Sequence, residues 1–445
     1  MLLRWPNQRL RIQLILIVPY AIKTKSVQGL IRRSGAIEDS PTDGYAPTFV
    51  TCPANFTVRQ PSGKTFVGEK ESAYVNEKAS RSNPAWRSYL TRAQLDDFDI
   101  ESFLPSNPIP GETLPNIGLA ISGGGIRALL GCAGVLNAFD DRNEQANLAG
   151  TGGVLQLSNY ITGLSGGSWL IGSWATSDFP TFTSLNESIW NLTEKNSYAS
   201  WNSIKRYPKA IKQAELKHKA GFPSSLADVQ AYILSHHLIN DTHHGTKVLF
   251  SSIRNTTGYK NYTAPFPILL STSRHQGKST IDLNTTIYEF SPEEFGVNHP
   301  SLNAYIPIDY LGSHLNSGKP ISNDSCALGF DNAGWVISAS SNVLSQPGVS
   351  GSFSWQTIET EAYNTMTRNI YDEAIVPNPF YKLQEENSTF MYEDQNQKDL
   401  YLADGGWGGE VVPFWPLLQP DRKLDAIIAI DYVADGPSMY HGACE

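Results

Sequence analysis

Two consecutive segments of the chain share one pattern: a short apolar run, a glycine-rich turn, and then a stretch whose apolar residues recur at helical spacing. The first segment reads IGLAI at 117–121, SGGG at 122–125 and IRALLGCAGVLNAFDD from residue 126. The second reads LQLSNYIT at 155–162 and GLSGGSWLIGSWAT at 163–176. A short, fully apolar run is typical of a buried strand, and strands that alternate with helices indicate an α/β architecture. We therefore predict an α/β chain with a sheet covered by helices.

The remaining segments predict a leader followed by one large domain. Residues 1–44 place arginines before a short apolar run, as a secretion signal does, and then form a linker. Residues 45–445 are expected to form one large domain, because no repeat or low-complexity tract divides them. Within it, residues 180–260 are polar with helical patterns, and we interpret them as a helical cap or insertion. Further strands are expected at FPILLSTS (266–273), TIYEFSP (286–292), AYIPIDYLG (304–312), LYLAD (400–404) and AIIAI (426–430), and a helix within SNPAWRSYLTRAQLDDFDIESFL (82–104).

The composition excludes several classes of protein. Of the 445 residues, 40% are hydrophobic and 17% are charged, a balance typical of a globular chain rather than a disordered one. The net charge of −9 argues against a nucleic-acid-binding protein, because neutralising phosphates requires a basic surface. No run approaches about 18 uninterrupted apolar residues, so no transmembrane helix is expected. Nothing in the sequence indicates an obligatory protein partner.

Sequons and cysteines predict the compartment of the protein. N-x-S/T sequons are more frequent than chance supplies, which predicts a secreted or wall-associated, N-glycosylated protein. The four cysteines show no CxxC spacing, which argues against a zinc site. Cys132 lies in an apolar helical pattern and is expected to be buried and free, whereas Cys52 and Cys326 lie in loops and could pair, although the pairing is left open. The sequons are at Asn55, Asn186, Asn191, Asn240, Asn255, Asn261, Asn284, Asn323 and Asn387.

Ser165 lies between Gly163 and Gly167 at a predicted strand-to-helix junction. The pattern G-x-S-x-G forms a strained elbow that presents a serine hydroxyl above a sheet, and the helix N-terminus that follows favours negative charge. The alternative is an ordinary serine in a glycine-rich turn, because both residue types are common there. The strand and helix patterns on either side favour the interpretation of Ser165 as a nucleophile.

The turn at Gly123–Gly125 is a candidate oxyanion hole. Three glycines between a predicted strand and a helix N-terminus expose backbone N–H groups that can bind an anion. The turn lacks the Gly-Lys-Ser/Thr of a Walker A loop and the third glycine of a dinucleotide fingerprint. A tight turn for close packing is the alternative, but it gives no role to Arg127, one turn into the helix. Beside an oxyanion hole, the Arg127 guanidinium can hold a substrate phosphate by paired hydrogen bonds.

The residues alone leave two candidates for the base that would activate Ser165. A Ser-acid-His hydrolase needs a late histidine, and His441 is the histidine that follows the acidic candidates. Asp404 follows a predicted strand and precedes a glycine turn, from which its carboxylate can reach the serine, although an ordinary Asp-Gly turn is the alternative. The histidine pairs at 236–237 and 243–244 lie in a polar segment without ligands at metal spacing, and are expected at the surface.

Three motifs in this order, SGGGIRA, GLSGGSW and LADGG, resemble those of the fungal phospholipase B/lysophospholipase family. The catalytic domain of that family is related to cytosolic phospholipase A2 and, more distantly, to patatin. The resemblance extends from about Tyr45 to Asp435 and includes NIGLAISGGG, YEFSPEEFG and CALGFDNAGWVISASSN. It implies a mixed central sheet covered by helices. It also implies hydrolysis of fatty-acyl esters of (lyso)glycerophospholipids at a membrane or micelle surface, without a cofactor or a metal.

The resemblance also implies roles for single residues. In this family a serine and an aspartate act as a dyad without histidine. Carried over, Ser165 is the nucleophile and Asp404 is the base and later the acid. The backbone N–H groups of Gly124 and Gly125 form the oxyanion hole, and Arg127 binds the phosphate.

The chain departs from the family pattern at three places. Ile126 stands where the family has an aromatic residue, and Trp407–Val411 replace a Glu-Asp-Gly-Gln-Asn segment, which removes a polar asparagine near Asp404. The family also continues past the AIIAIDYVADG strand, so we expect the domain to be truncated at its C-terminus.

Two alternative functions stay open. One is an α/β-hydrolase esterase that uses Ser165, Asp404 or Asp431, and His441 as a triad. The other is a catalytically inactive, truncated homologue that only binds lipid.

Overall fold

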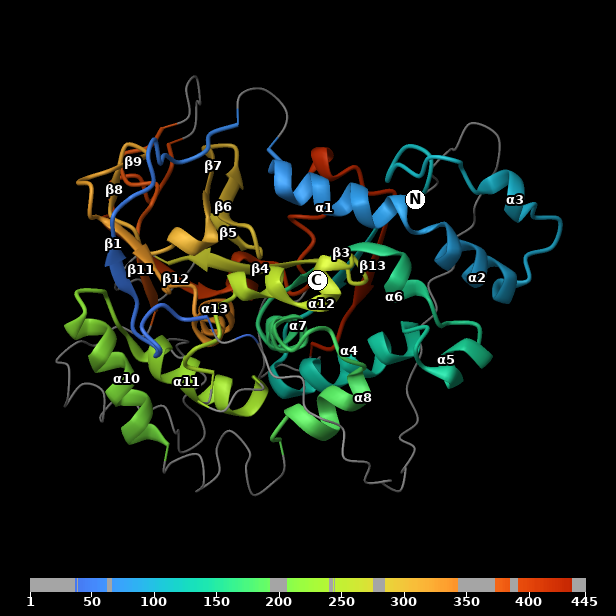
Figure 1. The fold of residues 1–445 in the computed structure, drawn as a ribbon, viewed down its shortest axis with the longest axis horizontal. Helices are drawn as coiled ribbons and strands as arrows, with labels where there is room; N and C mark the ends of the chain where they lie inside the picture. The colour runs from blue at the N-terminus through green and yellow to red at the C-terminus, as the bar shows by residue number, and fades with distance from the viewer. Residues whose placement is uncertain are drawn as a thin grey trace. The chain divides into compact units, whose positions relative to one another are not determined.

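A mixed sheet of nine strands forms the centre of the described structure (Figure 1). The computed structural model describes residues 37, 39–61, 66–192, 206–239, 243, 245–274, 285–342, 373–384 and 391–433, all within the unit Ser34–Glu445. Four neighbouring strands run parallel: β13 (Ala426–Ile430), β2 (Ile117–Ile121), β3 (Ser158–Gly163) and β4 (Phe266–Ser273). Three strands then continue antiparallel: β5 (Ile287–Phe290), β6 (Glu294–His299) and β7 (Leu302–Pro307).

Two other strands pair with the same edge of strand β4, one along each half of it. Its first half pairs in parallel with β3, ending at Gly163 beside Leu269. Its second half pairs antiparallel with β12 (Asp399–Asp404), where Asp404 lies beside Ser271. Since β5 occupies the other edge of β4, β3 and β12 approach each other end to end. Their last residues are two positions apart along β4, or about 7 Å at the usual strand rise. A further strand, β11 (Ala374–Pro377), pairs with the outer edge of β12.

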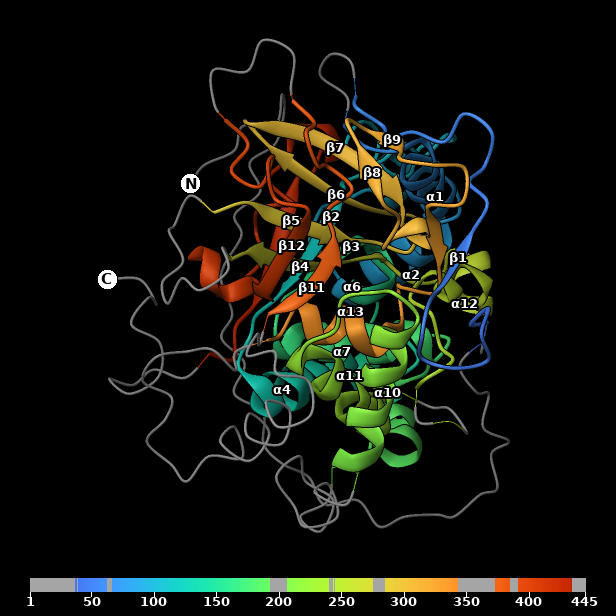
Figure 2. The same ribbon diagram turned by 90° about the vertical axis from the view of Figure 1, so that its left-hand side faces the viewer.

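Helices cover both faces of this sheet (Figures 1 and 2). Tyr160 of β3 contacts Phe266, which Tyr74 of helix α1 (Glu69–Ser80) covers on the same face. Gly163 faces Ile171 of helix α7 (Gly166–Thr176), and residues three apart on a strand point to opposite faces. The α7 side also carries α4 (Gly125–Phe139), α11 (Leu226–Leu238) and α13 (Ala333–Ala339), with α10 (Tyr207–Lys219) packed outside α11.

Shorter elements connect these layers. The helices are α2 (Asn83–Ala93), α3 (Ile100–Phe103), α5 (Glu144–Leu148), α6 (Val154–Leu157), α8 (Phe182–Ser184) and α12 (Thr257–Lys260). Two small ribbons lie outside the main sheet: β1 (Thr48–Val50) with β10 (Cys326–Leu328), and β8 (Leu315–Asn316) with β9 (Lys319–Pro320). Among the described residues, no helix has both the length and the apolar character that a membrane span requires.

The predicted strands and helices are confirmed with four corrections. The strand expected at residues 304–312 ends at Pro307, and Ile308–Tyr310 form a 3-10 turn instead. Residues 155–157 were expected in a strand but form the helical turn α6, which the Ser158 hydroxyl closes by donating to Val154 O at 2.8 Å. The helix expected from residue 82 ends at Ala93, because Gln94 adopts a left-handed conformation with φ 47°, and Leu95 beyond it is exposed. Within the predicted cap, α11 is buried on both sides and belongs to the core.

His237 corrects the prediction that the histidine pair at 236–237 lies at the surface. Its side chain is buried on α11, and its Nδ1 lies 2.8 Å from the carbonyl oxygen of Asn191. Burial lowers the pKa of this imidazole, so the ring is held neutral as a structural hydrogen-bonding group.

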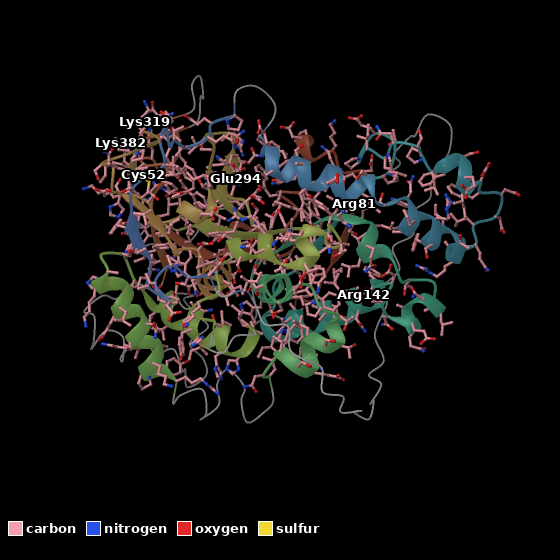
Figure 3. The ribbon with its side chains drawn as sticks, viewed as in Figure 1. Cys52, Arg81, Arg142, Glu294, Lys319 and Lys382 are labelled. Carbon is pink, nitrogen blue, oxygen red and sulfur yellow. A yellow bond between two sulfur atoms is a disulfide. The ribbon has the colours of Figure 1, made fainter. Side chains whose placement is uncertain are left out.

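Three of the four cysteines lie within the described residues, and Cys444 lies outside them. Cys52, labelled in Figure 3, forms a disulfide with Cys326, which joins the end of the β1 segment to β10. Cys132 is buried on α4 and free, as predicted, and burial raises the pKa of its thiol to about 12. The structure therefore assigns the pairing that the sequence left open.

Candidate active site

Ser165 occupies a strained backbone position between β3 and α7. Its φ of 51° and ψ of −124° lie outside the regions that residues with side chains prefer, so the surrounding structure must hold them. The Ser165 N–H donates to Ser340 O at 2.8 Å. The glycines beside it are required: a Cβ on Gly166 would lie 2.3 Å from Gly125 O, and one on Gly167 2.6 Å from Ile121 O. This arrangement is the sharp turn predicted for a nucleophile elbow.

The glycine turn after β2 lies directly against Ser165. A Cβ added to Gly123 would be 3.1 Å from the Ser165 Cβ and 3.6 Å from its Oγ. Gly124 and Gly125 have φ values of 126° and 61°, which only glycine adopts at low cost. The Gly123 N–H donates to Val411 O at 3.0 Å, which fixes the turn to the segment that follows Asp404.

Three peptide N–H groups, in the Ser165 elbow and in the glycine turn packed against it, have no hydrogen-bond acceptor among the described residues. Two belong to Gly124 and Gly125, at the start of α4, and one belongs to Gly166, at the start of α7. The first N–H groups of a helix have no partner within the helix and carry the positive end of its dipole. The sequence predicted Gly124 and Gly125 for this role, whereas Gly166 was missed. Gly166 was identifiable from its position, because the residue directly after the serine of a G-x-S-x-G elbow supplies a backbone N–H to an oxyanion hole.

Asp404 ends β12 with its carboxyl group buried, at 2% exposure. Its Oδ1 accepts the Gly406 N–H at 2.8 Å, whereas its Oδ2 has no full hydrogen bond among the described residues. Burial raises the pKa of Asp404 from 3.8 to about 6, against the nearby Ser165 hydroxyl and the Gly406 N–H, which lower it. The hydroxyl thus faces the carboxyl group closely enough to affect its protonation without a closed hydrogen bond, as is common before substrate binds.

Arg127 lies on the exposed side of α4 next to the glycine turn. Its Nε donates to Tyr432 O at 2.7 Å, in the segment after β13. This contact folds the guanidinium over Gly124, where a Cβ would lie 3.1 Å from Nη2. The cation is therefore held at the mouth of the candidate oxyanion hole.

The structure brings together five of the residues that the sequence suggested: Ser165, Asp404, Gly124, Gly125 and Arg127. His441 lies outside the described residues. In the part of the chain that the structure describes, no histidine hydrogen-bonds to Ser165 or Asp404. The polar asparagine that the family has near position 411 is replaced by Val411, yet the backbone carbonyl of that residue still binds the glycine turn.

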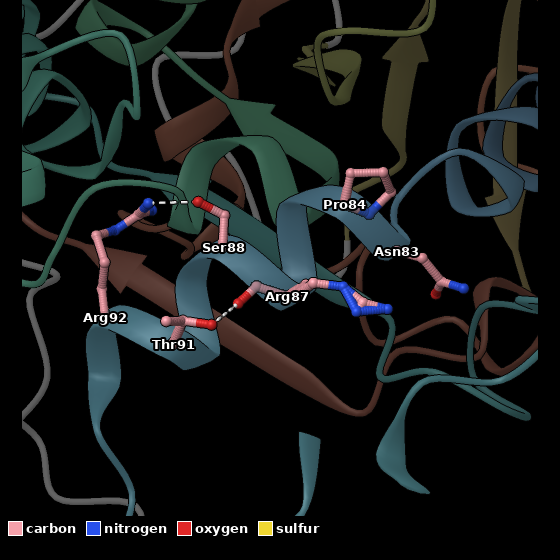
Figure 4. Close-up of a pocket in the computed structure, with 6 residues that line it drawn as sticks. All are labelled: Asn83, Pro84, Arg87, Ser88, Thr91 and Arg92. Carbon is pink, nitrogen blue, oxygen red and sulfur yellow. Dashed lines mark hydrogen bonds between the residues drawn. The ribbon is translucent and has the colours of Figure 1, made fainter. Parts of the chain in front are cut away.

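A surface hollow over α2 is remote from these residues (Figure 4). Arg92 of α2 donates to Gly152 O at 2.6 Å, just before α6 and the N-terminal end of β3, whereas Ser165 follows its C-terminal end. Arg87 pairs with Glu101 at 2.7 Å. Both arginines are thus engaged in structural contacts. The hollow is lined by Asn83, Pro84, Arg87, Ser88, Thr91 and Arg92.

Comparison with known proteins decides the family. The family model described as "Lysophospholipase catalytic domain" matches residues 117–443. The chain belongs to this family. It is 36% identical over 403 residues to probable lysophospholipase 3 of Schizosaccharomyces pombe, covering 88% of this chain and 59% of the relative. It is 34% identical over 425 residues to a lysophospholipase of Penicillium chrysogenum, covering 90% of this chain and 67% of the relative. The chain thus spans about three fifths to two thirds of the length of these family members.

Solved structures give the same fold. Human GIVD cytosolic phospholipase A2 superposes with a TM-score of 0.61 at 17% sequence identity, over 85% of this chain and 51% of that one. The same human protein in complex with methyl gamma-linolenyl fluorophosphonate gives a TM-score of 0.55 at 18% identity. The structural matches confirm the predicted mixed sheet covered by helices, and the family model and the fungal relatives confirm the predicted family. The roles of Ser165, Asp404, Gly124, Gly125 and Arg127 stay predictions.

Proposed function

We propose that the chain is a carboxylic ester hydrolase that releases fatty acids from lysophospholipids and phospholipids, with Ser165 as the nucleophile and Asp404 as the base. One observation carries the proposal. Two strands meet end to end on β4, one presenting a serine in a strained elbow and the other a buried carboxylate with an oxygen that lacks a full hydrogen bond within the described structure. The names of the fungal relatives support lysophospholipids as the substrate class.

The arrangement suggests a two-step reaction. Asp404 takes the proton of the Ser165 hydroxyl as Oγ attacks the acyl carbonyl carbon, and the oxygen of the tetrahedral intermediate accepts the N–H groups of Gly124 and Gly125. When the intermediate collapses, the ester bond breaks and Asp404 returns the proton to the departing glycerol oxygen. A water molecule then gives a proton to Asp404 as its oxygen attacks the acyl-enzyme carbonyl carbon. When this second intermediate collapses, the bond to Ser165 Oγ breaks, Asp404 returns the proton to Oγ, and the fatty acid leaves.

An aspartate suits this role only where its basicity is increased. With a pKa of about 6, Asp404 is ionised at neutral pH yet a much stronger base than an aspartate in water. The Asp404 carboxylate is still a far weaker base than the alkoxide of Ser165. The reaction therefore also requires that the oxyanion of the tetrahedral intermediate be stabilised. Preorganised N–H groups at two helix N-termini are suited to that task, because they need no reorganisation during the reaction.

Arg127 supplies a test of the substrate class. Replacing Arg127 with alanine is expected to raise KM for lysophosphatidylcholine about 10- to 100-fold, the loss expected for hydrogen bonds to a charged phosphate. KM for a monoacylglycerol with the same acyl chain should not change. Fatty-acid release from both substrates measures this, with Arg87→Ala as the control because Arg87 is an arginine in a surface ion pair on α2. Equal increases of KM for both substrates would contradict a phosphate contact.

We also propose that the chain enters the secretory pathway. The Cys52–Cys326 disulfide supports this, because disulfides persist in oxidising compartments. Exposed sequon asparagines support it too: Asn55, Asn186, Asn255, Asn261 and Asn323.

Digestion with an N-glycosidase should lower the mass of protein purified from a eukaryotic host. The variant Asn323→Gln should show a smaller loss of mass than the wild type. A wild-type chain whose mass is unchanged by the digestion would contradict N-glycosylation.

A further inference from the structure

Helix α13 ends beside the candidate active site, and the short segment after it contacts both halves of that site. The carbonyl oxygen of Ser340 accepts the Ser165 N–H at 2.8 Å and the Gly405 N–H at 3.3 Å. Two residues further on, the carbonyl oxygen of Asn342 accepts the Asp404 N–H at 3.1 Å. One carbonyl group therefore binds the backbone of the Ser165 elbow and the backbone of the aspartate loop, the segment that begins at Asp404 and Gly405.

The side chain of Ser340 makes a second connection at the same place. It is fully buried, and its hydroxyl contacts both Leu270 O and the Ser168 hydroxyl, the latter at 2.6 Å. A carbonyl oxygen can only accept, so Ser340 donates its single proton to Leu270 O and must accept from Ser168. This direction of donation links α13, the first turn of α7 and β4 into one buried chain of hydrogen bonds.

Leu270 is the residue of β4 at which β3 and β12 meet. Its neighbours Leu269 and Ser271 lie beside Gly163 and Asp404, the last residues of those two strands. The Leu270 carbonyl oxygen faces this edge, because a Cβ on Gly405 would lie 2.8 Å from it. Ser340 thus supplies the hydrogen bond at the one position of this edge that lies between the two strand pairings.

We propose that Ser340 is a positioning residue that sets the separation between the Ser165 hydroxyl and the Asp404 carboxylate. This rests on the proposed function of those two residues. Ser340 touches neither reacting group and acts through their backbones, by holding the strained elbow and the aspartate loop against the same point of β4. Because a misplacement of about 1 Å can cost about 100-fold in rate, loss of its hydroxyl should affect catalysis far more than substrate binding.

The variant Ser340→Ala tests this, with Ser338→Ala as its matched control. Ser338 is also fully buried at the end of α13, and its hydroxyl also donates to a backbone carbonyl, that of Ala227 at 2.7 Å, away from the site. Both variants should lose similar amounts of unfolding free energy. Ser340→Ala alone should lower kcat for lysophosphatidylcholine by about 10- to 100-fold with KM unchanged. It alone should also shift the midpoint of the pH dependence of kcat/KM.

A second pair of variants covers the case in which Ser340→Ala does not fold. Ser168→Ala removes the donor to Ser340 from the first turn of α7. Ser173→Ala, on the same helix, removes a buried hydroxyl that donates to Leu238 O at 2.5 Å, away from the site. Ser168→Ala should lower kcat by about 3- to 10-fold relative to Ser173→Ala, a smaller loss because the bond between Ser340 and Leu270 remains.

The outcomes separate the two proposals. A wild-type chain that releases fatty acid, with kcat values in the site-linked variants equal to those in their controls, overturns the positioning role alone. A wild-type chain without Ser165-dependent release overturns the proposed function and, with it, the role of Ser340.

Discussion

Replacement of Ser165 by alanine is expected to lower kcat for fatty-acid release from lysophosphatidylcholine by about 10³- to 10⁶-fold. The reason is that no acyl-enzyme can form once the Oγ atom is removed, so the only remaining rate comes from water attack on a substrate polarised by the N–H groups of the glycine turn. Alanine accepts the same backbone strain as serine at φ 51°, so the variant should fold like the wild type.

Three measurements make this result specific. The wild type should be covalently labelled by an alkyl fluorophosphonate on the peptide that contains Ser165, and the variant should not. The variant should still bind micelles of lysophosphatidylcholine. Ser173→Ala, which removes a buried hydroxyl from the same helix, should keep most of the activity.

Two outcomes would contradict the proposal in different ways. Unchanged release by the Ser165→Ala variant would place the nucleophile elsewhere in the chain. No release by the wild type, together with binding to the micelles, would favour the alternative of an inactive homologue that only binds lipid.

The elements that were predictable are those whose signal is local. Strands β2 and β13 are short apolar runs, and their bounds, Ile117–Ile121 and Ala426–Ile430, follow from hydrophobicity alone. The elbow at Ser165 was predictable because glycines at fixed positions around a serine indicate that another backbone segment packs against the turn too closely for a side chain. Strand β6 (Glu294–His299) was missed, because it carries only two apolar side chains, Phe295 and Val297, with a glycine between them.

The features that were not predictable depend on contacts between distant segments. Nothing near Asp404 in the sequence indicates that β12 abuts β3 on the same edge of β4, because strand pairing is non-local. The burial of His237 depends on α11 being enclosed on both sides. The part played by Ser340 was equally hidden, since a serine at a helix end is common and its value here comes from facing Leu270.

Replacement of Asp404 by asparagine is expected to lower kcat by about 10³- to 10⁴-fold while making the protein more stable above pH 6. The loss of rate follows from removing the base, because an amide cannot accept the Ser165 proton. In the wild type, kcat/KM should rise tenfold per pH unit below about pH 6 and level off above it, as Asp404 ionises. The contact between Oδ1 and the Gly406 N–H can be kept by the amide oxygen of asparagine, so the loop should stay in place.

The effect on stability has the opposite sign to that of a carboxylate in a salt bridge. Because burial raises the pKa of Asp404 from 3.8 to about 6, the folded protein binds this proton more tightly than the unfolded chain. The resulting stability is fully present below pH 3.8 and is lost as the pH rises through 6. The difference of about two units between the pKa values of the unfolded and folded states lowers the unfolding free energy of the wild type at pH 8 by an amount on the order of 3 kcal/mol. Asparagine at this position carries no charge and avoids this loss.

Urea unfolding between pH 4 and pH 8 measures this difference. Asp404→Asn and the wild type should be equally stable near pH 4, and the variant should gain steadily up to about pH 7. Asp331→Asn is a matched control, because burial raises the pKa of that carboxyl group to about 7 away from the site. It should gain stability with the same sign but keep its activity. A wild type that is more stable than Asp404→Asn at pH 8 would contradict a buried, poorly compensated carboxylate.

The pH profile alone does not identify the base, because a histidine titrates near pH 6.5 and would give a similar rise. His441→Ala separates the two possibilities. With Asp404 as the base, this variant should keep kcat/KM within about threefold of the wild type, since no step then passes through imidazole. A loss of about 10³-fold or more would instead support the Ser-Asp-His triad. The double variant Asp404→Asn/His441→Ala completes the cycle: it should be no slower than Asp404→Asn alone if the imidazole takes no part.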